Sequence, residues 1–332
     1  MRALLSKTAG LEGLTLCEAP DPEPGPKQVM IQVKACGVNF PDLLMIEDRY
    51  QFKPPRPFAP GGEFSGVVAW AGEAVSSLQA GDRVIGGNRF GGAAELVAVD
   101  EDRVIVMPDS MDFEDGAALL TTFGTSQHAL KDRARLQGGE TLLVLGAAGG
   151  AGLSAVALGR AMGARVIAAV STPEKAEFCK ANGADEAVIY PRGPFDADQR
   201  KALAQLFKDA VGEAGAHVVY DTIGGAYAEA AFRALAWEGR FLVIGFAAGD
   251  IPRIPLNLVL LKHAEVLGVF WGEWARRNPE RHRHNVAELM ALYEAGKARP
   301  VISERYPLAR GADAFARLAN REALGKIVVQ IG

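Results

Sequence analysis

Apolar residues in the first 120 positions occur in short, alternating runs, which is the pattern of half-buried strands. The longest such run is QVMIQVKACGV at 28–38. Shorter runs follow at 66–72, 82–87, 93–99 and 102–108. Prolines at 19–26 and 52–63 mark loops, because proline cannot donate to a strand ladder. This part is predicted to form a small, mainly antiparallel barrel or sandwich.

After about residue 120 the apolar runs are continuous and are separated by helix-like segments. They lie at 141–146, 164–170, 186–190, 217–221, 239–245 and 264–270. This rhythm predicts six βα units and therefore a parallel sheet covered on both faces. A helical stretch at 307–319 and a strand at 325–331 follow, and we expect that strand to return to the N-terminal domain.

The expected architecture is α/β with two domains, which suits 332 residues. We place a β domain at 1–122, completed by 271–332, and a doubly wound six-stranded domain at 123–270. No apolar run reaches the ~18 residues that span a bilayer, so we expect no membrane partner. The first residues lack the pattern of a secretory signal, and three scattered cysteines suit a reducing cytosol. A net charge of −4 disfavours nucleic acid as a partner.

The segment GAAGGAG at 146–152 joins the first parallel strand to an alanine-rich helix. Gly149, Gly150 and Gly152 allow a tight turn and a close approach of the backbone to a ligand. The helix N-terminus would direct its free N–H groups at a pyrophosphate. A glycine-rich turn without a nucleotide is the simpler alternative, but the strand–turn–helix context favours a dinucleotide site.

The end of the second parallel strand indicates which dinucleotide is bound. NAD sites place a carboxylate there for the ribose 2′-hydroxyl. This chain has Ser171 and Thr172 instead, followed by Pro173 and Lys175. A hydroxyl and an ammonium suit a 2′-phosphate, so we predict NADPH as the cofactor. Thr172 also has the position of a helix cap, with Pro173 first in the helix.

Seven stretches together resemble one family, the zinc-independent (zeta-crystallin-like) quinone oxidoreductases of the medium-chain dehydrogenase/reductase superfamily. They are GVNFPD (37–42), FAPGGEFSGVV (58–68), AGDRVIG (80–86), GAAGGAG (146–152), STPEKAEF (171–178), VVYDTIGG (218–225) and GRFLVIGF (239–246). The resemblance implies a GroES-like β-barrel catalytic domain followed by a Rossmann domain. It also implies an NADPH:quinone oxidoreductase.

The resemblance also indicates that no metal takes part. Zinc-dependent relatives hold a cysteine at the position of Asn39 and a histidine at that of Gly62, so only Glu63 remains of these ligands. Catalytic zinc needs about three protein ligands. Cys36 lies three residues before the ligand position and is expected to be a small buried side chain.

Further site residues are implied by position in the family. Asn39 and either Thr125 or His128 match nicotinamide and ribose contacts. The pyrophosphate turn corresponds to Gly149, Gly150, Ala151 and Gly152. The 2′-phosphate contacts correspond to Ser171, Lys175, Tyr190 and Arg321, although Pro191 after Tyr190 departs from the family pattern. The strand ends beside the nicotinamide correspond to Gly245, Phe246 and the segment 269–272, which includes Phe270.

Reduction of a quinone or an enone builds negative charge on a carbonyl oxygen, which a hydrogen-bond donor must meet. Asn39 and Tyr50 are the candidate donors. Asp42 lies one helical turn after Asn39, and we expect it to orient Asn39 or cap the turn, with acid–base catalysis as the alternative. Tyr50 is otherwise a packing aromatic.

Three functions remain open: a reductase of quinones or small α,β-unsaturated carbonyls, an enoyl-thioester reductase, and a non-enzymatic NADPH- or RNA-binding protein. The basic segment 274–285 is interpreted as a solvated helix with Asn278 as its cap and Pro279 first. The aromatic segment 268–274 is interpreted as an edge strand. Relatives dimerise through such an edge, so a homodimer is expected.

Overall fold

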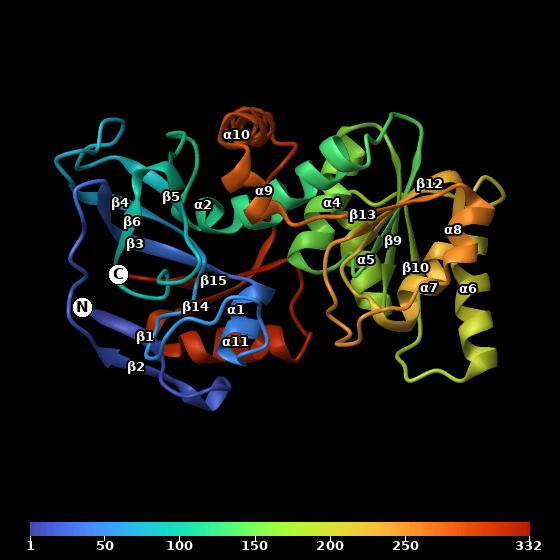
Figure 1. Ribbon diagram of the computed structural model, residues 1–332, viewed down its shortest axis with the longest axis horizontal. Helices are drawn as coiled ribbons and strands as arrows, with labels where there is room; N and C mark the ends of the chain where they lie inside the picture. The colour runs from blue at the N-terminus through green and yellow to red at the C-terminus, as the bar shows by residue number, and fades with distance from the viewer. The chain divides into compact units, whose positions relative to one another are not determined.

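The computed structural model describes residues 1–332, which divide into two compact units. The first unit comprises 1–121 and 300–332, and the second comprises 122–299. None of the helices combines the length and the apolar character that crossing a bilayer requires. Figure 1 labels the elements of both units.

The first unit is built mainly from a seven-stranded sheet. The strands of the whole unit are β1 (Arg2–Ser6), β2 (Leu14–Glu18), β3 (Gln28–Val38), β4 (Glu63–Ala71), β5 (Arg83–Gly87), β6 (Leu96–Asp100), β7 (Val104–Val106), β14 (Ile302–Pro307) and β15 (Lys326–Gln330). Its helices are η1 (Leu11–Gly13), α1 (Phe40–Ile46), η2 (Glu101–Arg103), α2 (Phe113–Leu119), η5 (Leu308–Arg310) and α11 (Gly311–Ala319). The sheet order is β14-β15-β3-β4-β5-β7, β6 pairs with β3, and β1 and β2 form a separate pair.

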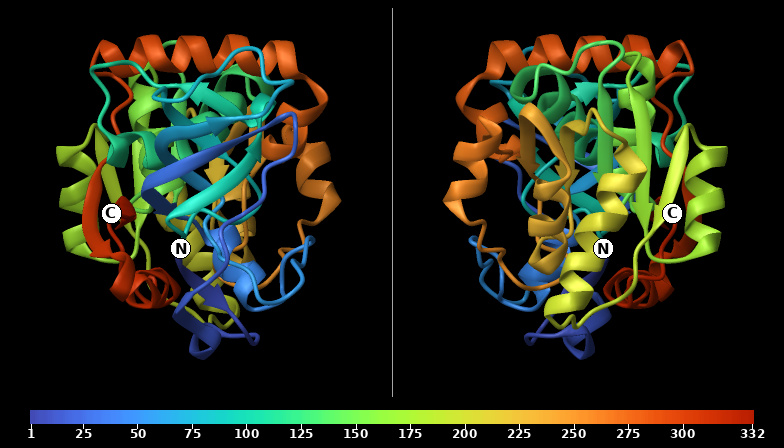
Figure 2. Two further views of the ribbon diagram at one scale, coloured as in Figure 1. Left: turned by 90° about the vertical axis from the view of Figure 1, so that its left-hand side faces the viewer. Right: turned by 90° about the vertical axis from the view of Figure 1, so that its right-hand side faces the viewer.

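All pairings in this unit are antiparallel except that of β14 with β15, as the alternating pattern predicted. β15 pairs with β3, so the C-terminal strand returns to the N-terminal unit as expected. The C-terminal strands are red in Figure 2. Strand β3 is long because its inward residues, among them Val29, Ile31 and Val33, are fully buried. Burial of each such side chain is worth about 1.5–3 kcal/mol.

The second unit contains the predicted six-stranded parallel sheet. Its strands are β8 (Thr141–Leu145), β9 (Arg165–Val170), β10 (Glu186–Ile189), β11 (Ala216–Asp221), β12 (Leu235–Val243) and β13 (Glu265–Gly268). The order is β10-β9-β8-β11-β12-β13, the doubly wound order in which ligands bind at the carboxyl ends of the strands.

Helices cover both faces of this sheet, with α4 and α5 on one side and α6, α7 and α8 on the other (Figure 1). They are α4 (Gly150–Ala161), α5 (Pro173–Ala181), α6 (Ala197–Val211), α7 (Gly225–Arg233) and α8 (Leu256–Lys262). The remaining helices are η3 (Leu120–Gly124), α3 (Thr125–Gln127), η4 (His128–Arg133), α9 (Trp271–Arg277) and α10 (Pro279–Glu294). Both η3 and η4 are π-helical, a form found frequently at functional sites.

Two expectations about residues 271–299 are wrong. The predicted edge strand ends at Gly268, and Trp271–Arg277 is helical because Glu273 pairs with Arg276 and Arg277 one turn later. Residues 271–299 also belong to the second unit and not to the β domain.

The contacts of α10 explain that membership. Asn285 donates to Asp132 at 2.8 Å, and Glu288 pairs with Lys131 and accepts from Gln127 at 3.2 Å. The helix begins at Pro279 as predicted, but the predicted cap is wrong. The Asn278 side chain forms no capping hydrogen bond, and its Nδ2 donates to the Trp274 carbonyl at 2.9 Å.

Candidate active site

The junction of β3 and α1 positions the first group of predicted site residues. Asn39 is the residue before α1, and its backbone is extended. Asp42 accepts a hydrogen bond from the Asn39 N–H at 2.8 Å with one oxygen and from the Gly62 N–H at 3.0 Å with the other. Asp42 therefore ties the start of α1 to the segment that precedes β4.

Burial raises the pKa of Asp42 to about 6, against the opposing effect of the backbone N–H groups of Asn39 and Gly62. Both oxygens of Asp42 are engaged by these groups, and only 1% of its surface is exposed. This arrangement suits a residue that fixes the backbone at Asn39 better than one that exchanges protons with a substrate.

Lys326, the first residue of β15, lies at the centre of this region. Its Nζ donates to Asn39 Oδ1 at 2.7 Å, to Glu63 Oε2 at 3.1 Å and to the Val38 carbonyl at 3.4 Å. The side chains of Lys326 and Glu63 are 4% and 1% exposed. A buried ammonium and a buried carboxylate thus neutralise each other, as buried charges require.

The remaining contacts of Glu63 complete the cluster. Asn39 Nδ2 donates to Glu63 Oε2 at 2.9 Å, and the Thr121 N–H donates to Oε1 at 2.8 Å. We name Asn39, Glu63 and Lys326 the Lys326 cluster. Sequence reasoning missed Lys326, and the available signal was a lysine at the start of the apolar strand IVVQI.

The positions that correspond to zinc ligands are occupied differently here. A Cβ added at Gly62 would lie 2.9 Å from the Asn88 carbonyl oxygen, so a histidine there would displace backbone. No group of three or more His, Cys, Asp and Glu side chains is arranged to hold a metal ion. Cys36 is fully buried, as expected for a packing side chain, and burial raises the pKa of its thiol.

The two predicted donors differ in their availability. The Asn39 amide already donates to Glu63 and, at 3.5 Å, to the Gly37 carbonyl, and the residue is 8% exposed. Tyr50 is half-buried and its hydroxyl has no protein partner, while its N–H is fixed by the Leu44 carbonyl at 3.1 Å. Of the two predicted donors, Tyr50 therefore has the more available hydrogen.

The glycine turn of the second unit has the conformation that a dinucleotide needs. Gly146 directly follows β8 with φ of 71°, and Gly149 precedes α4. A Cβ at Gly152 would lie 2.3 Å from the Gly146 carbonyl oxygen, so only glycine fits there. The first N–H groups of α4, at Gly150, Ala151 and Gly152, lack partners within the helix and suit a pyrophosphate.

The residues predicted for a 2′-phosphate follow β9 and β10. Thr172 accepts from the Lys175 N–H at 3.2 Å, so it caps α5 as expected, and Pro173 is the first residue of α5. Burial and the nearby Arg192 lower the pKa of Lys175. Arg192 is a cation that the sequence prediction did not include.

Tyr227 fixes the segment that carries Arg192, and Tyr190 packs against Tyr227. The Tyr190 ring packs against Tyr227 and Phe207, with centroids 4.9 and 6.3 Å away. The Tyr227 hydroxyl donates to the Pro191 carbonyl and accepts from the Gly193 N–H, each at 3.2 Å. Tyr190 is thus largely a packing residue.

The other predicted cofactor residues are more scattered. His128 is 3% exposed, stacks on Trp274 with ring centroids 4.0 Å apart and forms a hydrogen bond with Asp132 at 2.8 Å, so its ring is engaged within the protein. The remaining residues lie at or beyond strand ends or in turns. Gly245 and Phe246 follow β12, Phe270 follows β13 and is 59% exposed, and Arg321 lies in a turn after α11 in the first unit.

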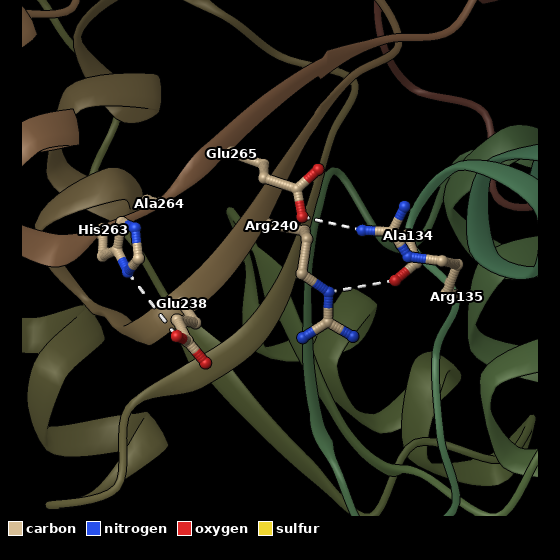
Figure 3. Close-up of a pocket in the computed structure, with 7 residues that line it drawn as sticks. All are labelled: Ala134, Arg135, Glu238, Arg240, His263, Ala264 and Glu265. Carbon is tan, nitrogen blue, oxygen red and sulfur yellow. Dashed lines mark hydrogen bonds and ion pairs between the residues drawn. The ribbon is translucent and has the colours of Figure 1, made fainter.

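A surface cavity of about 480 Å³ lies at the amino ends of β12 and β13 (Figure 3). Its charges are paired: Arg135 with Glu265, His263 with Glu238, and Arg240 with Glu140 outside the lining. Because dinucleotides bind at the opposite ends of such strands, this cavity is not the cofactor site.

Comparison with known proteins also divides the chain into two parts. Residues 25–109 match the family model of the alcohol dehydrogenase GroES-like domain, and residues 150–293 match that of zinc-binding dehydrogenases. The rat quinone oxidoreductase-like protein 2 is 36% identical over 319 residues, covering 96% of this chain and 89% of the rat protein.

Solved structures are similarly close. A probable oxidoreductase from Mycobacterium abscessus is 38% identical with a TM-score of 0.86, covering 99% of this chain and 98% of that one. A mycobacterial protein solved with NADPH is 28% identical with a TM-score of 0.91, covering 99% and 100%. This chain belongs to the zinc-independent quinone oxidoreductase-like family of the medium-chain dehydrogenase/reductase superfamily.

Proposed function

We propose that this protein is an NADPH-dependent reductase that transfers hydride to quinones or small α,β-unsaturated carbonyls without a catalytic metal. The observation that carries the proposal is the Lys326 cluster, in which the Lys326 ammonium balances the Glu63 carboxylate. The unpartnered Tyr50 hydroxyl in the same unit supplies a donor for a carbonyl oxygen. The relatives' names and the NADPH complex support the same reaction class.

The preference for NADPH rests on the residues that follow β9 and β10. Ser171, Lys175 and Arg192 offer a hydroxyl and two cations, and no carboxylate ends β9. A 2′-phosphate would contact these cations and offset the repulsion by which Arg192 lowers the pKa of Lys175. The pyrophosphate would be held by the N–H groups of Gly150, Ala151 and Gly152.

The reaction balances with one further proton. NADPH, when bound, supplies a hydride, and solvent supplies a proton, so that a quinone becomes a hydroquinone and NADP⁺ remains. Tyr50 stabilises the negative oxygen through a hydrogen bond that its hydroxyl donates. This hydrogen bond strengthens as charge develops on the oxygen. Asp42 and the Lys326 cluster hold the backbone and the amide of Asn39 in place.

The test is a panel of NADPH oxidation with an o-quinone, a p-quinone, an alkenal and crotonyl-CoA. We expect turnover with a quinone or the alkenal, and a lower kcat in Tyr50→Phe with little change in NADPH affinity. A preference of about 100-fold for crotonyl-CoA, ~2.7 kcal/mol in transition-state binding, would identify an enoyl-thioester reductase instead. Tight NADPH binding without turnover of any acceptor would indicate a non-enzymatic binder.

The basic segment 274–285 gives no support to an RNA-binding function. Arg276 and Arg277 pair with Glu273, and Arg281 lies over the Trp274 ring and within 3.7 Å of Asp132. These arginines are therefore partly neutralised within the protein.

We also propose that the protein is a homodimer through the β13 edge of the second unit. β13 pairs only with β12, and α8 nearby exposes Leu256, Leu260 and Leu261 by 80%, 78% and 68%. A second copy would continue the sheet and cover these leucines. Light scattering should give a dimer for the wild type and a monomer for Leu260→Glu, and a wild-type monomer would contradict the proposal.

A further inference from the structure

Two adjacent loops of the first unit are held rigidly beside Asp42. The Asn88 N–H donates to the Gly62 carbonyl at 2.9 Å, and the Gly91 and Gly92 N–H groups donate to the carbonyls of Ala59 and Gly61, each at 2.8 Å. A Cβ at Gly62 would lie 3.4 Å from the Arg89 carbonyl oxygen and 3.7 Å from Asp42 Oδ1. The backbone at Arg89 is therefore fixed directly next to the candidate substrate site.

Aromatic rings from these loops support the Arg89 side chain. The guanidinium carbon of Arg89 lies 4.6 Å from the centroid of the Phe52 ring. Phe52 stacks on Phe90 at 6.0 Å with an interplanar angle of 16°, and Phe90 meets Phe58 edge-on at 5.8 Å. This stack orients a cation over an aromatic surface at low conformational cost.

Arg89 differs from the neighbouring arginines in its charge balance. Arg49 pairs with Glu47 at 3.0 Å, and Arg56 pairs with Asp48 at 2.9 Å. Arg89 is exposed and forms no ion pair with a carboxylate. It also lies close enough to Tyr50 for its charge to oppose the rise in the pKa of that phenol.

We propose that Arg89, Phe52 and Tyr50 form a subsite for planar acceptors that carry an anionic substituent, such as a carboxylate or sulfonate. This inference rests on the proposed reductase function and specifies its substrate class. The acceptor ring lies beside the edge of the Phe52 ring, its carbonyl oxygen accepts from Tyr50, and its anionic group meets the guanidinium that Phe52 supports. Guanidinium suits this role because it binds carboxylate and sulfonate oxygens through two parallel hydrogen bonds.

The test measures NADPH oxidation by the purified full-length protein. It compares phenanthrenequinone with its sulfonated derivative as the acceptor. We expect the wild type to have a lower KM for the sulfonate. Arg89→Gln should raise that KM by about tenfold, the usual loss for one charge-assisted contact, and leave the KM of the neutral quinone unchanged. Arg89→Lys should restore part of the preference. Arg49→Gln, which removes an arginine that already has a partner, is the matched control and should change neither KM.

A binding measurement separates this inference from the proposed function. The redox-inert naphthalene sulfonate should bind the wild type more tightly than neutral naphthalene sulfonamide, and Arg89→Gln should remove the difference. That result supports the subsite even when no quinone is turned over. Equal KM changes for both quinones, or no loss of sulfonate preference in Arg89→Gln, overturns the inference while leaving quinone reduction intact.

Discussion

The two units build their candidate sites from different parts of the polypeptide. In the second unit, the glycine turn at 146–152 offers backbone N–H groups, and its shape follows from seven consecutive residues. In the first unit, the Lys326 cluster is made of side chains on three strands or their ends, separated by up to 287 positions. The glycine turn of the second unit is a local site built from backbone N–H groups. The Lys326 cluster of the first unit is built from charged and polar side chains that are far apart in the sequence.

This difference determines how each site fails. A backbone site is disturbed when a side chain is added, because a Cβ takes space that glycine leaves free. A buried charge cluster is disturbed when a side chain is removed, because the remaining charge loses its partner. The predictions below test this contrast, beginning with the largest expected effect.

Removal of the ammonium in Lys326→Met should lower the free energy of unfolding by about 3–5 kcal/mol, since Glu63 would remain buried and unpaired. Urea unfolding followed by circular dichroism measures this loss. The double variant Lys326→Met/Glu63→Gln should recover much of it. Additive losses in the double variant would show that the two charges are not coupled.

Each of the two units contains a buried carboxyl that accepts hydrogen bonds from backbone N–H groups. Burial raises the pKa of Asp42 and of Asp221 to about 6, and Asp221 accepts from the N–H groups of Ile223 and Gly224 at 2.8 and 3.0 Å. The folded protein therefore holds each proton up to about pH 6, whereas the unfolded chain releases it near the ordinary aspartate pKa of 3.8.

The contribution of each carboxyl to the free energy of unfolding is therefore greatest below pH 3.8. It decreases by up to about 3 kcal/mol as the pH rises to about 6. Urea unfolding measures this decrease between pH 4 and pH 7. The free energy of unfolding should fall more in the wild type than in Asp42→Asn, which alters the first unit, or in Asp221→Asn, which alters the second. An unchanged difference between wild type and each variant at the two pH values would contradict the raised pKa.

Loss of the cation in Lys175→Ala should weaken NADPH binding by about ten- to a hundredfold and leave NADH binding nearly unchanged. Arg192→Ala should act in the same direction with a smaller effect, since that side chain is exposed. Nucleotide fluorescence titration measures both. Lys180→Ala, on the same helix and paired with Glu177, is the control. Equal losses for NADH and NADPH would remove the 2′-phosphate assignment.

The smallest effect should come from one methyl group in the glycine turn. Gly152→Ala should destabilise the second unit by about 1–3 kcal/mol, because the new Cβ meets the Gly146 carbonyl oxygen at 2.3 Å. Gly149→Ala, whose Cβ would lie 3.6 Å from the same oxygen, should be nearly neutral. Thermal unfolding of the two variants gives the comparison, and similar melting temperatures would show that the turn adapts.

Local patterns were sufficient to predict the parallel sheet, the glycine turn and the cap at Thr172, because each depends on neighbouring residues. Lys326 was missed because its role arises only when β15 pairs with β3, which no local pattern specifies. The segment 271–274 was assigned to a strand from its aromatic content. Its helix depends instead on Glu273 and its two arginines, and on the contacts of α10.

The position of Lys326 also bears on the order in which the chain folds during synthesis. The second unit is continuous from 122 to 299 and can close as soon as that segment has emerged from the ribosome. The first unit holds Glu63 in its interior, and the ammonium that neutralises this carboxylate is synthesised 263 residues later. The N-terminal domain, although made first, therefore completes its core last.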